Sequence, residues 1–341
     1  MKVLGIESSC DETSASVVEI GSDALRVCSC ATASQDALHE EYRGVVPEIA
    51  SRAHLECIVP VVRAALREAG VTLGSISGVA SGTRPGLIGS LLVGTSAAKA
   101  IAWASGRPFV GVDHVAAHLV ACLLDRPPIA WPALGLVVSG GHTSLFSMQS
   151  PLEPVLLGAT IDDAAGEAFD KAAAILGVGY PGGARLDLAA ERGDAGLIPL
   201  PRTRLRGHDF SFSGLKTALA LAQQRAPKET DALAASFRLA VVDQLLDRTW
   251  RASEEVAART LLVGGGVAAN ALLRRELTRG CEIRGIDLRL SEPRYCTDNA
   301  AMIAATGALR LQRGERDGWE TVAEPLSSLA RGRRGERRRI G

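Results

Sequence analysis

The chain has 341 residues, of which 47% are hydrophobic and 22% are charged, so it is long enough to bury two packed domains of an ordinary globular protein. Its 38 basic and 38 acidic residues balance, and this balance, with 4% aromatic residues, gives no independent sign of nucleic-acid recognition. Its seven cysteines are scattered without a CxxC pair, which argues against both a disulfide framework and a zinc knuckle.

The first half of the chain alternates between strand and helix patterns. Residues 3–20 predict a strand, a polar turn and a returning strand, because an apolar run and a β-branched run flank small hydroxyl residues. The opening has too few apolar residues for a signal peptide or a membrane span, so we expect a cytoplasmic protein with no membrane partner. Helical spacing follows at 47–70, 86–106 and 113–125, with short strands at 77–82 and 108–112.

The second half repeats the opening plan. Residues 134–148 again predict a strand, a glycine- and hydroxyl-rich loop and a returning strand. Further helices are expected at 162–177, 212–224, 230–256 and 296–311, and a buried strand with a glycine turn at 260–266. This order favours a duplicated α/β fold with a cleft between two lobes.

Prolines at 125–133 mark the boundary between the halves. We predict an N-terminal lobe at 1–131, a C-terminal lobe at 132–326 whose last helix returns to the cleft, and a basic, disordered tail at 327–341. Residues 331–341 hold six arginines and one glutamate, which leaves the body with 32 basic and 37 acidic residues, a net charge of −5. The tail either solubilises the chain or attracts polyanions.

Two glycine-rich loops that follow strands are candidates for phosphate binding, because glycine lets backbone N–H groups approach an anion. They are residues 139–141 and 264–266, the second running into a helix start. A plain tight turn is the alternative for each. Residues 177–182, GVGYPG, fit GxGxxG only formally, because they follow a helical pattern instead of a strand.

A group of charged residues lies in the helix expected at 162–177. If the segment is helical, Asp163, Glu167 and Asp170 share a face, with Lys171 beside them. One interpretation is a solvated surface. The other is a carboxylate near the glycine loops that binds a ribose hydroxyl or a substrate amine.

His114 and His118 lie four residues apart on an apolar helix, which puts both imidazoles on one face as candidate metal ligands. Packing or helix-terminal hydrogen bonding is the alternative. In HExxH metalloproteases a glutamate activates zinc-bound water, but Val115 occupies that position here, so a metal would act as a Lewis acid or a clamp. Asp298, at the start of the last helix, is a candidate third ligand, and Thr297 or Asp298 is a candidate cap.

Together these motifs resemble the bacterial tRNA N6-adenosine threonylcarbamoyltransferase family, the TsaD family, formerly called glycoprotease. The similarity covers nearly the entire chain, through GIESSCDETS, GVVPEIASRAHL, PGLIGSLLVG, VSGGHTSL, IDDAAGEAFDKAA, YPGG, FSFSGLKTAL, GGGVAAN and CTDNAAMIA. The resemblance implies an actin-like fold of the sugar kinase and heat-shock ATPase type, with an interlobe cleft. Arg84 departs from the family pattern, in which many members have a small residue.

The resemblance also implies the site residues. His114, His118 and Asp298 would be catalytic and would bind one divalent metal ion per subunit, iron or zinc. The adenylate of the donor, threonylcarbamoyl-AMP, would be bound by Val137, Val138, Ser139, Gly140, Gly141, Asp170, Gly183 and Asn270, with Asp187 near the ribose.

The implied reaction moves the threonylcarbamoyl group to N6 of the adenosine 3′ of the anticodon, in tRNAs that read codons beginning with A. The implied partners are tRNA, a TsaB-like paralogue, a TsaE-like ATPase and a TsaC/Sua-type synthase that supplies the donor. Two alternatives remain: an ATPase or kinase of the same fold, which would turn over ATP without tRNA, and a metalloprotease, against which Val115 argues.

Overall fold

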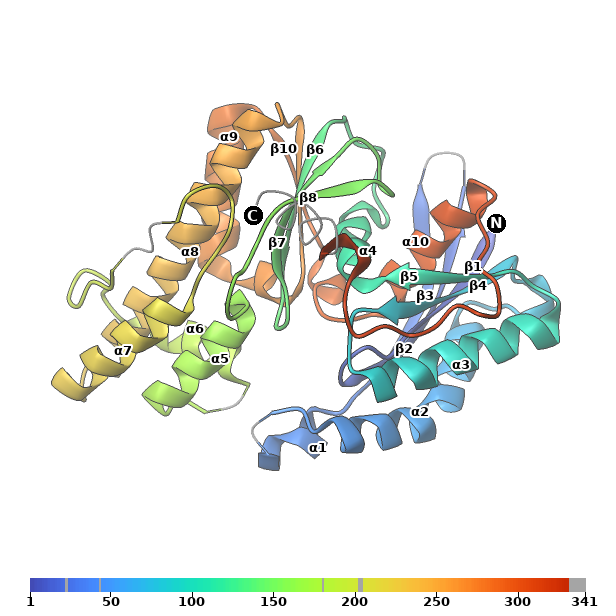
Figure 1. Cartoon of the computed structure of the whole chain (residues 1–341), viewed down its shortest axis with the longest axis horizontal. Helices are drawn as coiled ribbons and strands as arrows, with labels where there is room; N and C mark the ends of the chain where they lie inside the picture. The colour runs from blue at the N-terminus through green and yellow to red at the C-terminus, as the bar shows by residue number, and fades with distance from the viewer. Residues whose placement is uncertain (22–23, 43, 180, 202–204, 331–341) are drawn as a thin grey trace, which may run out of the picture. The chain divides into compact units, whose positions relative to one another are not determined.

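The computed structural model describes residues 1–21, 24–42, 44–179, 181–201 and 205–330. These residues divide into two units, one formed by Met1–Ile129 with the described residues from Ser291 onward, the other by Ala130–Leu290 (Figure 1). Within the described ranges, no helix combines the length and the apolar character needed to cross a membrane.

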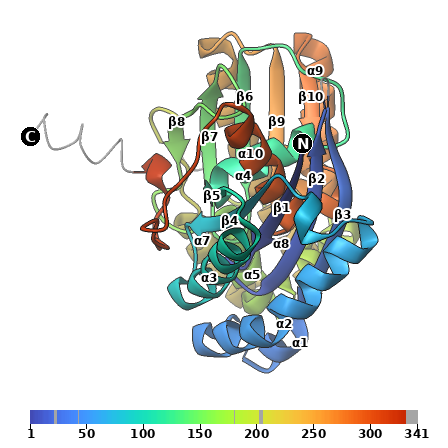
Figure 2. The same cartoon turned by 90° about the vertical axis from the view of Figure 1, so that its right-hand side faces the viewer.

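A five-stranded mixed sheet forms the centre of the first unit. Its strands are β1 (Lys2–Glu7), β2 (Glu12–Ile20), β3 (Leu25–Ser34), β4 (Gly78–Arg84) and β5 (Phe109–Asp113). Its helices are α1 (Asp36–His39), α2 (Pro47–Glu68), α3 (Ile88–Ser105), α4 (His114–Val120) and α10 (Ala300–Gln312). The strand order is β3-β2-β1-β4-β5, an antiparallel meander extended by two strands parallel to β1 (Figure 2).

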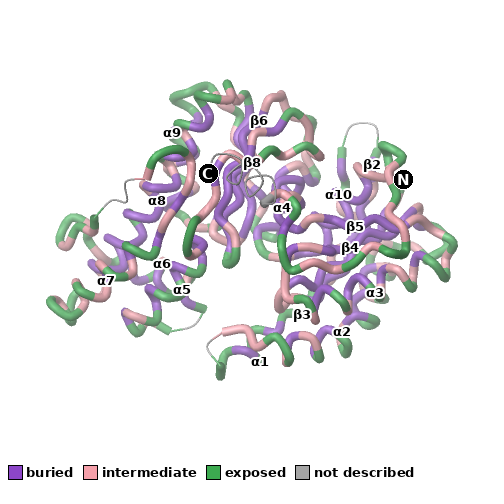
Figure 3. Tube along the Cα trace, in the orientation of Figure 1, coloured by how far each residue is buried: buried purple, intermediate pink, exposed green. Residues whose placement is uncertain are grey.

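Residues Val3 to Glu7 of the central strand β1 are all buried, so both faces of this strand are covered, which explains why its sequence is a continuous apolar run instead of an alternating one. The neighbouring strands β4 and β5 are also mostly buried (Figure 3). Successive side chains of a strand point to opposite faces. Leu4 and Ile6 accordingly pack with residues of α2 and α3, whereas Val3 packs with residues of α4 and α10. The face that carries α4 and α10 is the one on which the histidine pair lies.

Helix α10 lies directly on the sheet backbone, because no bulky side chain separates them at the crossing. A Cβ added at Gly5 would lie 2.5 Å from the carbonyl oxygen of Ala300, and one added at Gly307 would lie 2.4 Å from Cβ of Ala80. Every residue from Ala300 to Ala308 is buried. The helix is therefore apolar around its whole circumference along this stretch.

The position of α10 differs from the domain division that the sequence suggested. Residues 291–326 were expected in the C-terminal lobe, but they belong to the first unit. Helix α10 packs on β1, β2 and β4, and leaving this sheet would expose its apolar surface to water.

The first residues of the expected tail at 327–341 are attached to the first unit. The hydroxyl groups of Ser327 and Ser328 donate to Oδ2 of Asp113 at 2.7 and 3.2 Å, which attaches this segment to the first unit. Just before it, Glu324 lies 3.7 Å from Arg84, a partly exposed ion pair of small energetic weight. The arginine-rich residues 331–341 lie outside the described residues.

The second unit repeats the plan of the first. Its strands are β6 (Ala133–Val138), β7 (Thr143–Met148), β8 (Pro154–Ala159), β9 (Thr260–Gly264) and β10 (Asp287–Leu290). Its helices are α5 (Ala165–Leu176), α6 (Gly182–Arg192), α7 (Ser213–Arg225), α8 (Thr230–Glu255) and α9 (Ala271–Arg284). The order β10-β9-β6-β7-β8 again extends an antiparallel meander by two parallel strands. The prediction of a duplicated α/β fold is confirmed.

Most expected elements are present, and the missed strands share a physical reason. The strand pairs at 3–20 and 134–148 are β1–β2 and β6–β7, and each expected helix is found. Sequence analysis did not identify β3, β8, β10, α1 or α6. The three missed strands lie at sheet edges, where several positions stay partly exposed and the apolar pattern is weak.

We expect Gly5→Ala to lower the free energy of unfolding by about 1–3 kcal/mol, because the new methyl group overpacks the contact with α10. Thermal unfolding measures this as a lower Tm. Gly214→Ala in α7 is the matched control, since a Cβ added there meets nothing within 4 Å. An unchanged Tm for Gly5→Ala would contradict the close packing of α10.

Candidate active site

The two histidines are presented by a single short helix in the first unit. Strand β5 ends at Asp113, and α4 begins with His114. Oδ1 of Asp113 caps the helix by accepting from the backbone N–H groups of Val115 at 3.0 Å and of Ala116 at 3.5 Å. A capped start fixes the helix register, and His118, one turn later, then lies on the same face as His114.

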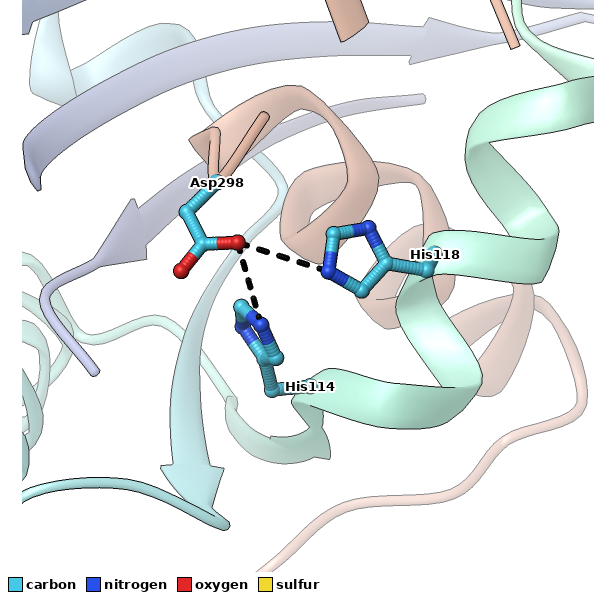
Figure 4. A group of neighbouring side chains, drawn as sticks. All are labelled: His114, His118 and Asp298. Atoms are coloured by element: carbon cyan, nitrogen blue, oxygen red, sulfur yellow. Dashed lines mark ion pairs between the residues drawn. The ribbon is translucent and has the colours of Figure 1, made fainter. Parts of the chain in front are cut away.

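Both imidazoles meet one carboxylate oxygen. Oδ1 of Asp298 lies 3.3 Å from Nε2 of His114 and 3.4 Å from Nε2 of His118 (Figure 4). The ring centroids are 4.7 Å apart and the ring planes are nearly perpendicular, at 82°. One ligand atom from each residue lies within 4.8 Å of the others, so this group could hold a metal ion.

Asp298 can face the histidines because its neighbour caps the following helix. The prediction that Thr297 or Asp298 caps α10 is wrong: Oδ1 of Asn299 accepts from the N–H of Met302 at 3.1 Å. Nδ2 of Asn299 also donates to the carbonyl oxygens of Tyr295 at 3.2 Å and Thr297 at 2.8 Å. The loop that carries Asp298 is therefore fixed on both sides.

Glu7, at the end of β1, holds His114 from the other side of its ring. Its Oε2 lies 3.0 Å from Nδ1 of His114, and its Oε1 accepts from the N–H of Ser9 at 2.6 Å. A Cβ at Gly82 would lie 2.7 Å from Oε2, so glycine makes room for this carboxylate. When Nδ1 donates to a carboxylate, Nε2 keeps its lone pair for a metal. Sequence analysis did not single out Glu7, although a carboxylate ending a buried strand was the available signal.

The charged groups of this site shift one another's pKa values. Burial lowers the pKa of His114, but the carboxylates of Asp298 and Glu7 outweigh burial and raise it well above the usual range. Burial, together with the charge of His114, lowers the pKa of His118. Burial raises the pKa of Asp298, but the two histidines outweigh it and hold that pKa well below its usual range. Without metal, the group therefore holds one protonated imidazole, one neutral imidazole and one carboxylate at neutral pH.

This donor set fits a divalent metal ion. Among the described residues, neither ring nitrogen of the buried His118 has a hydrogen-bond partner, although its Nε2 faces Asp298. A buried polar atom without a partner is costly unless a ligand engages it. Two imidazoles and a carboxylate suit zinc or ferrous iron, and three protein ligands leave positions open for a substrate.

Binding of Zn²⁺ at neutral pH should release about one proton, because the raised pKa of His114 keeps its ring protonated until a metal displaces the proton. The apparent affinity should accordingly rise with pH until the pH exceeds that raised pKa. Calorimetric titration in two buffers of different protonation enthalpy measures the released proton. Asp298→Asn, the control, should weaken binding by about 100-fold. A heat of binding that does not depend on the buffer would contradict the charge assignment.

The two glycine-rich loops lie side by side in the second unit. Strands β6 and β9 are parallel neighbours, with Val137 paired to Gly264, so the loops leave the same edge of the sheet. Gly265 has a φ of +98°, and a Cβ there would lie 2.3 Å from the carbonyl oxygen of Val138. Only glycine permits this approach. The side chains of Val137 and Val138 are fully buried, so only their backbone could meet a ligand.

The loop after β6 supports the start of α5. The carbonyl oxygens of Ser139 and Gly140 accept from the N–H groups of Gly166 at 3.1 Å and Glu167 at 3.2 Å. Within the described ranges, the N–H groups of Gly140 and Gly141 have no hydrogen-bond partner, and a Cβ on either residue would meet nothing within 4 Å. These two N–H groups can therefore receive an anion.

Asp170 and Gly183 meet where α6 begins. Oδ1 of Asp170, on α5, accepts from the N–H of Gly183 at 2.9 Å. A Cβ at Gly182 would lie 2.8 Å from the same oxygen, so glycine allows the two helices to approach. The contact links α5 to α6.

Asp187 and Asn270 are joined directly. Nδ2 of Asn270 donates to Oδ1 of Asp187 at 2.8 Å, while Oδ1 of Asn270 caps α9 by accepting from the N–H of Leu273 at 3.0 Å. Asn270 follows the short turn that begins after Gly265. The glycine loop after β6 contacts α5, α5 contacts α6 through Asp170, and α6 contacts Asn270 through Asp187. These contacts connect the predicted nucleotide residues within the second unit.

The other charged residues near α5 pair with one another. Nζ of Lys171 lies 2.7 Å from Asp163 and 2.7 Å from Glu167, and Lys216 also pairs with Asp163. Asp163 precedes the first residue of α5, so the expected helical face does not include it. Lys171 does not pair with Asp170, whose oxygen is engaged by α6 instead.

Comparison with known proteins gives strong sequence matches. A family model described as tRNA N6-adenosine threonylcarbamoyltransferase, TsaD, matches residues 26–305. A curated protein of that name from Symbiobacterium thermophilum is 50% identical over 335 residues, covering 97% of each chain. Another from Pelobacter propionicus is 52% identical over 321 residues, covering 92% of this chain and 93% of the relative.

Solved structures of low identity agree on the fold. HypF from T. kodakarensis has a TM-score of 0.64 at 14% identity, covering 92% of this chain and 48% of HypF. A ROK hexokinase from Thermus thermophilus has a TM-score of 0.52 at 18% identity, covering 92% of this chain and 100% of the hexokinase. These neighbours confirm the predicted actin-like fold, and the sequence matches add the family. The chain belongs to the tRNA N6-adenosine threonylcarbamoyltransferase family.

Proposed function

We propose that this chain transfers the threonylcarbamoyl group from threonylcarbamoyl-AMP to N6 of the adenosine 3′ of the anticodon, in tRNAs that read codons beginning with A. Membership of the family supports the reaction class. The observation that carries the mechanism is that one oxygen of Asp298 lies 3.3 and 3.4 Å from the Nε2 atoms of two histidines on one helix.

His114, His118 and Asp298 would hold the metal ion, which we propose to be iron or zinc. When bound, such an ion supplies a Lewis acid that polarises and clamps the threonylcarbamoyl group. Glu7 contributes by fixing the ring of His114 in one tautomer and orientation. Imidazole and carboxylate ligands suit both metals.

A water-activating base is missing from α4, which fits acyl transfer and not hydrolysis. Val115, the residue after the first histidine, is apolar and buried. Glu7 contacts the group directly, but one of its oxygens faces His114 and the other accepts from the N–H of Ser9. The donor is already activated as a mixed anhydride, and a base that made hydroxide would destroy it. These observations argue against the metalloprotease alternative.

The connected residues of the second unit would bind the adenylate. The N–H groups of Gly140 and Gly141 would donate to a phosphate oxygen, because within the described residues they have no hydrogen-bond partner and a Cβ on either glycine would meet nothing within 4 Å. Asp187 would accept from a ribose hydroxyl, and Asn270 would lie against the nucleotide beside it. Asp170 and Gly183 would complete the site from α5 and α6.

The chemical step needs positioning more than activation. The N6 amine attacks the carbamoyl carbon, a C–N bond forms, the bond from that carbon to the phosphate oxygen breaks, and AMP leaves with the electron pair. The amine proton passes to solvent or to the departing phosphate. Holding the amine against the acyl carbon supplies much of the rate enhancement in such a step.

The proposed partners follow the family. tRNA is the acceptor, and we propose that a TsaB-like paralogue and a TsaE-like ATPase assemble with this chain. A separate synthase of the TsaC/Sua type would make the donor from threonine, bicarbonate and ATP.

Reconstitution tests the proposal. Unmodified tRNA, incubated with this protein, its partners, the synthase, threonine, bicarbonate and ATP, should yield threonylcarbamoyladenosine in the nucleoside mass spectrum. His118→Ala should reduce the yield by about 100-fold or more, because a metal ligand is lost. His208→Ala is the matched control, since His208 pairs with Glu255 outside both sites.

Absence of the modified nucleoside, with partners shown to be active beside a relative, would refute the transferase. ATP turnover without tRNA under the same conditions would then favour the ATPase alternative.

A further inference from the structure

Arg238 is a buried arginine that the proposed reaction does not use. It lies in the first half of α8 and is only 8% exposed. Its neighbours in the helix, Phe237, Ala240 and Val241, are buried core residues. A guanidinium is rarely placed in such surroundings unless partners require it there. The contacts of Arg238 identify those partners.

Within the described residues, every hydrogen bond of its guanidinium is to α6. Nη1 donates to Oδ1 of Asp187 at 2.9 Å and also pairs with Glu191. Nη2 donates to the carbonyl oxygen of Ala190 at 3.3 Å. Arg238 therefore holds the helix that carries both Gly183 and Asp187, and it bonds to the side chain of Asp187 itself.

The two oxygens of Asp187 are in different situations. Oδ1 accepts from Arg238 and from Nδ2 of Asn270, at 2.9 and 2.8 Å. Oδ2 accepts no hydrogen bond from the part of the chain that the structure describes, and the side chain is 24% exposed. Two donors on one oxygen fix the carboxylate plane, so Oδ2 is presented in a constant direction with its lone pairs available.

We propose that Arg238 is a positioning residue for ribose recognition: it fixes Asp187, and through it Asn270, so that Oδ2 of Asp187 accepts from a ribose hydroxyl of the donor nucleotide. This inference rests on the proposed adenylate site. Without the guanidinium, the carboxylate of Asp187 loses one of its two anchors and rotates, and the amide of Asn270 loses its fixed acceptor. Binding must then order these two side chains, and the entropic cost of ordering them offsets the free energy of the ribose contact.

The test compares AMP with 2′,3′-dideoxy-AMP, by calorimetry on the full chain. The unaltered protein should bind AMP about tenfold more tightly, since the dideoxy nucleotide leaves a charged acceptor without its donor. Arg238→Met should weaken the binding of AMP about tenfold and leave that of the dideoxy nucleotide nearly unchanged. The ratio of the two affinities should then be close to one. A merely structural defect would weaken the binding of both nucleotides by the same factor and preserve the ratio of their affinities.

Glu191→Gln is the matched control, because Glu191 is the other carboxylate that Arg238 pairs with and its side chain is 57% exposed. This variant should keep the ratio of the unaltered protein. If circular dichroism shows that Arg238→Met does not fold, Arg238→Lys replaces it: lysine keeps the charge and the stem but not the fork, and should reduce the ratio.

If the folded Arg238 variant prefers AMP over the dideoxy nucleotide as strongly as the unaltered protein does, the positioning role of Arg238 is overturned and the adenylate site stands. An unaltered protein that binds AMP without preferring it over the dideoxy nucleotide would also overturn the inference. An unaltered protein that binds neither nucleotide would instead remove the adenylate site, and the inference with it.

Discussion

The candidate metal centre depends on the contact between α10 and the backbone of the first sheet. Gly5 in β1 and Gly307 in α10 carry no side chain at the crossing, so the helix reaches the strands directly. Helix α4 packs on the same face of the sheet as α10. Because Asp298 lies just before Asn299, the cap of α10, seating this helix brings the carboxylate of Asp298 to the two histidines of α4.

The second unit assembles its candidate residues by polar contacts instead. Asp170 receives an N–H of α6, Asp187 receives Arg238 and Asn270, and Asn270 caps α9. Within the described residues, these hydrogen bonds do not engage the N–H groups of Gly140 and Gly141 or Oδ2 of Asp187. We propose that these atoms bind the ligand. A site built in this way is organised before the ligand arrives, which lowers the cost of binding.

The sequence was sufficient for the plan of the fold and for part of each site. Apolar periodicity located the central strands and most helices, and a four-residue spacing identified His114 and His118 as a pair. Asp298 and the loop at 139–141 were candidates from the residues alone, but the other adenylate residues depended on family resemblance, because they come from distant segments. Glu7 and Arg238 were missed because their roles exist only through contacts with residues 107 and 51 positions away.

The placement of α10 was missed for a related reason. The apolar sequence of α10 predicts that the helix is buried, but it does not predict which of the two sheets the helix packs on. Its cap was misassigned because Thr297, Asp298 and Asn299 are all short and polar, and only the three-dimensional contacts show that Asn299 accepts from Met302. The error matters, because a capping Asp298 would be lost to the histidines.

The central claim, that His114, His118 and Asp298 bind one metal ion, is tested most directly by X-ray absorption spectroscopy of the full chain loaded with one equivalent of Zn²⁺. The account predicts a first shell of nitrogen and oxygen ligands, with the outer-shell scattering of two imidazoles, and a loss of one imidazole in His118→Ala. A shell that contains sulfur, or that is unchanged in His118→Ala, would contradict it.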